Sequence, residues 1–150
     1  MADFTTADVV KLRKTTGAGM MDCKNALTEA NGDFDQALDI IRKKGQLVAN
    51  KRADRDATEG VVLAKTTADG SKGIMIVLNC ETDFVAKNEK FIQFAESLLN
   101  VAVDQLPSNL DELKKLDLDG KSIEETVVEQ VGVIGEKLDL LSIQSLKLIQ

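Results

Sequence analysis

The chain has 150 residues and a net charge of −6, and it contains no tryptophan, tyrosine or histidine. No apolar run approaches the ~18 residues of a membrane span, and the missing histidine removes the usual general base and the commonest metal ligand. Residues 59–150 carry nine basic and sixteen acidic side chains, a balance that repels nucleic-acid phosphates. We therefore expect a cytoplasmic protein that binds neither nucleic acid nor membrane directly.

Residues 1–45 have the pattern of three short helices. A capping-box pattern at Thr5 predicts the start of the first helix, and the residues Gly17-Ala18-Gly19 are expected to end it. The second helix is predicted from about residue 21 to residue 30, with a stripe of small and apolar side chains facing inward. Three helices of this size bury only a small core.

The third helix is predicted to begin after an Asp33 N-cap and to end at Gly45, because glycine commonly follows the last helical residue. Residues 46–59 are mostly polar and are predicted to form a linker whose basic side chains are solvated. The two cysteines, Cys23 and Cys80, lie among apolar residues without metal-ligand spacing, so buried and reduced thiols are expected.

Residues 60–150 are predicted to form an α+β domain with a small antiparallel sheet. Residues 61–66 and 73–80 are strand-like and flank a turn, which predicts a hairpin. Because residues 73–80 lack alternation, they are expected to form a central strand that is buried on both faces. A third strand is predicted over residues 140–148, with a slip in its alternation at Ser145.

Helices are expected on one face of this sheet. A long amphipathic helix is predicted from about Asn88 to a point before Pro107, and residues 110–115 are expected to add a helical turn. A further helix is predicted after a Ser122 N-cap. Its glycines, Gly132 and Gly135, would weaken it by roughly 1 kcal/mol each unless close packing requires them.

The segment from Thr82 to Val85 forms a corner between the second strand and the long helix, where functional residues tend to concentrate. In one interpretation Asp83 caps the next helix and Phe84 packs on its first turn. In the other, Phe84 is exposed and anchors in a pocket of another protein. Glu81 and Asp83 also allow a carboxylate-dependent enzyme, although no pattern supplies a substrate pocket.

Met20 and Met21 stand at the start of the second helix, directly after the glycine-containing turn. Adjacent helical residues point about 100° apart, so the two side chains are not expected to face the core together. An exposed methionine is an adaptable contact surface, and Lys24 would lie beside Met20 on the same face. The Gly17-Ala18-Gly19 turn lacks the strand, the third glycine and the lysine of a nucleotide-binding loop.

Two segments carry a resemblance to one known family. Residues 12–33, LRKTTGAGMMDCKNALTEANGD, closely resemble the opening segment of bacterial translation elongation factor Ts. Residues 80–88, CETDFVAKN, are similar to the second signature of that family and stand at the expected distance. The resemblance extends over essentially the whole chain and is weakest over residues 104–150.

The resemblance implies a ubiquitin-associated-like module over residues 1–45, a linker over 46–59 and an α+β core over 60–150. It implies guanine-nucleotide exchange on elongation factor Tu, without catalytic chemistry, cofactor or bound metal of its own. The Thr82–Val85 corner would press on the nucleotide domain of the partner, and Phe84 would insert there and dislodge the magnesium ion and the phosphate loop. The positions expected to touch the same domain from the first module are Met20, Met21 and Lys24.

An alternative function uses the three-helix module alone, as an adaptor that binds peptides or ubiquitin-like proteins. Members of the elongation factor Ts family usually continue beyond this length, so the chain is expected to be a fragment or a naturally shortened form. Leu141 and Ser142 also stand where relatives often have a basic pair.

Overall fold

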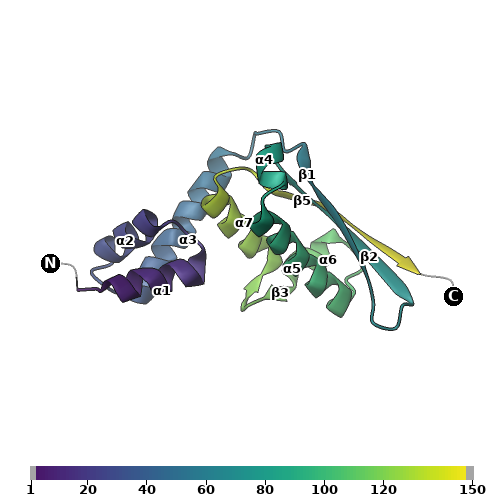
Figure 1. Ribbon diagram of the computed structural model, residues 1–150, viewed down its shortest axis with the longest axis horizontal. Helices are drawn as coiled ribbons and strands as arrows, with labels where there is room; N and C mark the ends of the chain where they lie inside the picture. Colours follow the sequence, from purple (N-terminus) through teal and green to yellow (C-terminus); the bar gives the residue numbers. More distant parts are fainter. Residues whose placement is uncertain (1–2, 148–150) are drawn as a thin grey trace. The chain divides into compact units, whose positions relative to one another are not determined.

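The computed structural model describes residues 3–147, which fold into two compact units (Figure 1). Unit 1 contains the chain up to Ala53 together with Val128–Gly135. Unit 2 contains Asp54–Val127 and the chain from Glu136 onward. The division into 1–45, 46–59 and 60–150 stays a prediction. In the described part of the chain, no helix combines the length and the apolar character needed to cross a membrane.

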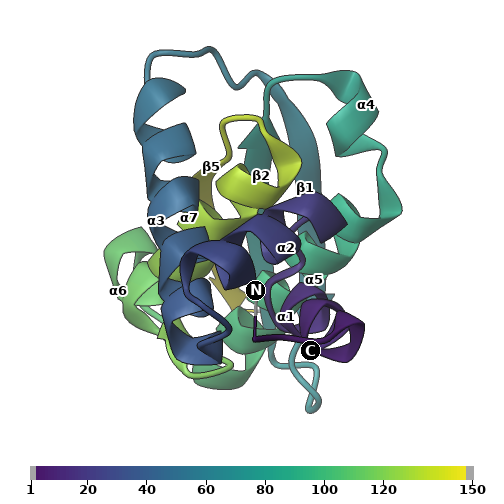
Figure 2. The same cartoon turned by 90° about the vertical axis from the view of Figure 1, so that its left-hand side faces the viewer.

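Unit 1 begins with three helices packed side by side (Figure 2), as predicted. They are α1 (Thr6–Thr16), α2 (Met20–Glu29) and α3 (Phe34–Lys51). Both predicted N-caps are confirmed, because Thr5 forms a complete capping box with Asp8 and the Asp33 side chain accepts from the Gln36 amide. The small core between the helices consists of Val9, Leu12, Ala18, Cys23, Ala26, Leu27, Ala30 and Ala37.

The predicted end of the third helix at Gly45 is wrong, because α3 continues to Lys51. Gly45 is buried inside the helix and faces α7 (Ile123–Ile134), whose residues from Val128 belong to unit 1. A Cβ added to Gly132 of α7 would lie only 2.5 Å from the Gly45 Cα. Close packing therefore requires Gly132, whereas Gly135 follows the last residue of α7 with φ +81° and donates to the Val131 carbonyl.

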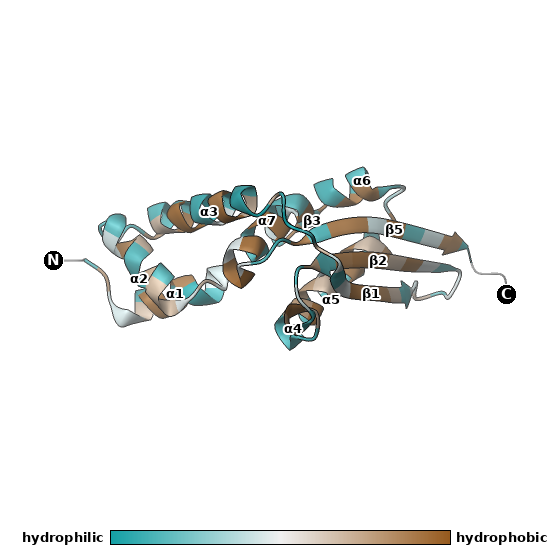
Figure 3. Cartoon of the chain, turned by 90° about the horizontal axis from the view of Figure 1, so that it is seen from above, coloured by the Kyte–Doolittle hydropathy of each residue, from teal (hydrophilic) through white to brown (hydrophobic). Residues whose placement is uncertain are grey.

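Unit 2 is built on a three-stranded antiparallel sheet in the order β1-β2-β5 (Figure 3). The hairpin joins β1 (Glu59–Thr66) to β2 (Lys72–Cys80), and β5 (Asp139–Lys147) pairs with the other edge of β2. The central position of β2 is therefore confirmed. The irregularity in β5 falls at Leu141, between the partners of Leu78 and Val77, and not at Ser145. Leu148, the last residue of the predicted strand, lies outside the described residues.

Helices cover only one face of this sheet, so the prediction that β2 is buried on both faces is wrong. The fully buried side chains of β2 alternate, and they are Ile74, Ile76, Leu78 and Cys80. Their neighbours on the opposite face remain partly exposed. The covering helix α5 (Glu89–Gln105) packs on β1 and β2, while α6 (Leu110–Lys115) packs on β5. Strands β3 (Asp117–Leu118) and β4 (Lys121–Ser122) form a small second sheet that was not predicted.

Candidate functional site

The corner between β2 and α5 is a one-turn helix, α4 (Asp83–Ala86). Its N-cap is Thr82, which has an extended backbone and whose hydroxyl accepts a hydrogen bond from the Val85 amide at 3.3 Å. Asp83 is the first helical residue, and its carboxylate pairs with Lys87 at 3.4 Å on the exposed surface. The interpretation in which Asp83 caps the next helix is therefore wrong, because Thr82 caps α4 and Asn88 caps the following helix α5 (Glu89–Gln105).

Phe84 projects from this helix into solvent. Its side chain is 82% exposed, the largest value among the exposed large hydrophobic side chains of the described residues. The ring therefore does not pack on its own helical turn as the first interpretation required. Val85, the next residue, is half-buried, and α4 as a whole contacts β1, β2 and α5. The phenyl ring is thus presented on a helix that is seated against the domain.

A distant carboxylate holds the start of this corner. Glu136 lies in the connection between α7 and β5, and its Oε1 accepts from the amides of Glu81 at 3.1 Å and Thr82 at 3.0 Å. Its Oε2 accepts from the Thr82 hydroxyl at 2.7 Å. In return, the Glu81 carboxylate accepts from the Lys137 amide at 2.7 Å. We call this reciprocal arrangement of Glu81, Thr82, Glu136 and Lys137 the carboxylate brace.

Sequence reasoning missed Glu136, because it lies more than fifty positions from its partners and no local pattern marks it. The structure also gives partners to Glu81 and Asp83, the two carboxylates that a carboxylate-dependent enzyme would use. Glu81 binds a backbone amide and Asp83 pairs with Lys87, so each has a structural partner. Within residues 3–147, no cluster of three or more histidine, cysteine, aspartate or glutamate side chains is arranged to hold a metal ion.

Cys80 closes the inner side of the corner. Its side chain is fully buried, and the thiol donates to the Thr82 carbonyl with a sulfur–oxygen distance of 3.2 Å. Burial, and to a smaller extent the nearby charge of Glu136, raises the pKa of the Cys80 thiol to about 11. Cys23 in unit 1 is also buried, and burial raises its pKa. Both cysteines are free and buried.

The predicted residues of the first module lie together at the N-terminal end of α2, in unit 1. Met20 is 42% exposed and Met21 is 64% exposed, so neither methionine is buried in the core. Lys24 is exposed one turn further along. The preceding Gly19 provides no side-chain cap for this helix end. The structure thus presents two soft apolar side chains and one cation on α2.

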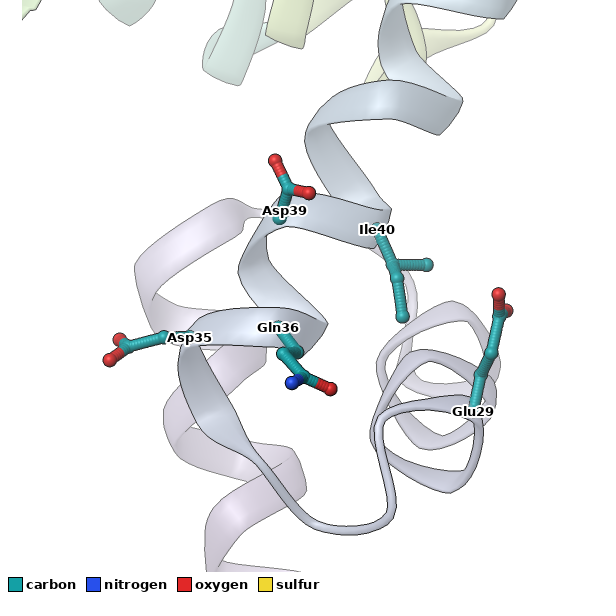
Figure 4. A pocket seen from close by; sticks show the side chains of 5 residues that line it. All are labelled: Glu29, Asp35, Gln36, Asp39 and Ile40. Carbon is teal, nitrogen blue, oxygen red and sulfur yellow. The ribbon is translucent and has the colours of Figure 1, made fainter.

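A separate pocket of about 510 Å³ lies between α2 and α3 (Figure 4). Its lining residues are Glu29, Asp35, Gln36, Asp39 and Ile40. The carboxylates diverge from one another around the rim rather than converging on one point. Asp39 is also paired with Lys43 at 2.8 Å. The pocket contains none of the predicted site residues.

The fold and the site define a two-unit α+β protein whose candidate site is an exposed surface. Residues 81–150 match the family model described as Elongation factor TS. A protein named Elongation factor Ts from Christiangramia forsetii is 53% identical over 147 residues, which cover 98% of this chain and 53% of that relative. The protein of the same name from Bacteroides thetaiotaomicron is 55% identical over 136 residues, covering 91% of this chain and 41% of the relative.

Over almost its whole length the chain is similar to proteins of the elongation factor Ts family. It spans about half the length of the curated relatives that it matches. The family match includes both the corner and residues 104–150, where the resemblance of the sequence is weakest.

Proposed function

We propose that this chain is a guanine-nucleotide exchange factor that binds elongation factor Tu and promotes the release of GDP. The similarity to elongation factor Ts supports the partner and the activity. The observation that carries the proposal is the 82% exposure of the Phe84 ring on a corner that the rest of unit 2 holds in place. This nucleotide exchange serves the elongation step of translation, and its proposed location is the cytoplasm.

The proposed mechanism needs no catalytic group. An exchange factor binds the nucleotide-free partner more tightly than the nucleotide-bound partner, so the factor and GDP weaken the binding of each other by the same amount. Phe84 inserts between side chains of the nucleotide domain, while Thr82, Asp83 and Val85 form the surrounding contact. This insertion displaces the magnesium ion and the phosphate loop, and the bound GDP leaves.

The α2 surface supplies the second part of the proposed contact. Met20 and Met21 offer flexible, polarisable side chains that adapt to an irregular surface. Lys24 adds a positive charge beside them. Their exposure in the isolated chain means that burying them against the partner removes apolar area from water without unfolding α2.

The test compares GDP release from elongation factor Tu in the presence of the full chain and of its Phe84→Ala variant. An aromatic anchor that is buried on binding contributes ~2 kcal/mol or more, which corresponds to about thirtyfold in affinity. The unfolding midpoint should hardly change, because the ring is 82% exposed. Val62→Ala is the matched control, since Val62 is 60% exposed on β1 and is not one of the proposed contact residues. Equal exchange rates and affinities for the parent and Phe84→Ala would exclude the ring as the inserted group.

The adaptor hypothesis is favoured by one specific observation, the joint exposure of Met20 and Met21 on the three-helix module. An adaptor would bind its peptide through α2 and would be indifferent to the corner. Capture of elongation factor Tu should therefore be compared for Met21→Ala and Phe84→Ala. If Met21→Ala alone lowers capture, and GDP does not compete, the adaptor hypothesis replaces exchange.

A further inference from the structure

We propose that Glu136 is a positioning residue for nucleotide exchange, and that it acts by holding the backbone from which Phe84 projects. This inference rests on the proposed function, because it assigns the brace to the same exchange reaction. Glu136 does not approach the partner in this scheme. It fixes the direction in which the exposed ring points before the partner arrives.

The hydrogen bonds of the brace are directional. Glu136 uses one oxygen for the Glu81 and Thr82 amides and the other for the Thr82 hydroxyl, so both orientation and position of the carboxylate are set. Hydrogen bonds to an ionised carboxylate are stronger than those between neutral groups. Glu81 binds the Lys137 amide in return, and the Lys137 ammonium donates to the Arg55 carbonyl at 3.1 Å. The loop that carries Glu136 is therefore held from two sides.

The corner needs such support because α4 is too short to be stable by itself. Forming a four-residue helix fixes the backbone dihedral angles of its residues but gains very few internal hydrogen bonds. An isolated helical turn of this length is therefore unfavourable. Phe84 is so exposed that ring packing does not orient it. The direction of the ring then depends on the backbone of α4, and that backbone begins at Thr82, where Glu136 binds.

A fixed direction matters for a group that must insert into another protein. Ordering a loop upon association consumes binding free energy, whereas a loop that is already ordered leaves this energy for the contact. The brace therefore favours insertion through pre-organisation. It links residues 81–82 to residues 136–137, which lie in different connections of unit 2. Neither connection makes this arrangement alone.

The first arm of the test measures the brace without any partner. Amide hydrogen exchange of Glu81 and Thr82 should be slow in the parent and much faster in Glu136→Ala. Glu136→Gln should restore part of the protection, because its carbonyl oxygen still accepts a hydrogen bond. Asp139→Asn is the matched control: Asp139 is half-buried three positions away, and no hydrogen bond or ion pair to a described residue engages its side chain.

The second arm measures GDP release from elongation factor Tu at saturating concentrations of the full chain. Glu136→Ala should slow release by about tenfold, equivalent to ~1.4 kcal/mol of barrier, and Glu136→Gln should recover most of the rate. In a Phe84→Ala background, Glu136→Ala should add no further loss, because the group that it positions is absent. A purely structural role would instead give equal losses with and without Phe84.

The two arms separate the failure of this inference from the failure of the proposed function. Unchanged protection of the Glu81 and Thr82 amides in Glu136→Ala would overturn the brace. Additive losses in the double variant would overturn the positioning role, even if the brace exists. If Phe84→Ala exchanges GDP like the parent, the proposed function fails, and the positioning role fails with it, whereas the hydrogen-exchange arm still decides whether the brace forms.

Discussion

Two glycines that meet between α3 and α7 should respond to alanine with opposite signs. A Cβ added to Gly132 would lie 2.5 Å from the Gly45 Cα, a distance that requires one backbone to move. A Cβ added to Gly45 would find its nearest neighbour, the Val128 carbonyl oxygen, at 3.6 Å, which is an ordinary contact. Alanine therefore causes a steric clash at Gly132 on α7, whereas at Gly45 on α3 its Cβ makes only ordinary van der Waals contacts.

The magnitudes follow from two opposing effects. Forcing an extra carbon into a filled site costs about 1–3 kcal/mol, and the opposing atom here belongs to the backbone and cannot rotate away. Replacing a helical glycine by alanine gains about 1 kcal/mol in helix propensity. Gly132→Ala should thus destabilise the protein by up to ~2 kcal/mol, whereas Gly45→Ala should stabilise it by up to ~1 kcal/mol.

The assay is urea unfolding followed by far-ultraviolet circular dichroism, because the chain contains no tryptophan or tyrosine for fluorescence. The shift in midpoint at unchanged slope gives the change in unfolding free energy. Gly120→Ala is not a suitable control, since φ at Gly120 is +87° and alanine would be strained there. Gly19→Ala has room, because its nearest neighbour would be the Asp22 side chain at 3.6 Å, and it should show only the small cost of alanine at the N-cap of α2. Equal effects of alanine at Gly45 and Gly132 would refute the close crossing.

Two further predictions concern the corner and the α2 surface. The raised pKa of Cys80, about 11 against an ordinary value of 9.0, contributes stability that is complete below pH 9 and is lost as the pH rises towards 11. The unfolding free energy of the parent should therefore fall more steeply across this window than that of Cys80→Ala, and parallel profiles would contradict the assignment. Lys24→Ala should weaken the complex with elongation factor Tu by up to ~1 kcal/mol and leave the thermal midpoint unchanged, because Lys24 is exposed. A large loss of thermal stability would place this side chain in the fold instead.

The parts of the fold that the sequence predicts correctly depend on neighbours in the chain. Thr5 and Asp33 mark helix starts because the capping partner of each lies three residues away. The hairpin follows from two strand-like segments around a turn, and the central place of β2 follows from its apolar composition. Helix α5 begins after Asn88, whose side chain accepts from the Lys90 amide. In each case the signal that allows the prediction is local in the sequence, although the place of β2 also depends on its pairing with β5.

The incorrect predictions concern contacts between distant residues. Gly45 looks like a helix end in the sequence, because nothing nearby reveals that Gly132 will pack against it. The apolar run in β2 suggests burial on both faces, because its composition gives no information on which face of the sheet the helices cover. Glu136 had no assigned role, since its partners Glu81 and Thr82 are distant in sequence. These features require tertiary structure.

The candidate site combines both kinds of information. The sequence alone leaves two roles for Phe84, which differ in whether the ring packs on its own helix or is exposed to a partner. The structure assigns the cap to Thr82, and the hydroxyl of Thr82 can serve both as acceptor for the Val85 amide and as donor to Glu136. The orientation of an exposed ring is consequently tied to a carboxylate in another connection of the fold. An aromatic residue at a strand-to-helix corner is therefore a sound basis for predicting a contact site only when the residues that fix its backbone are known as well.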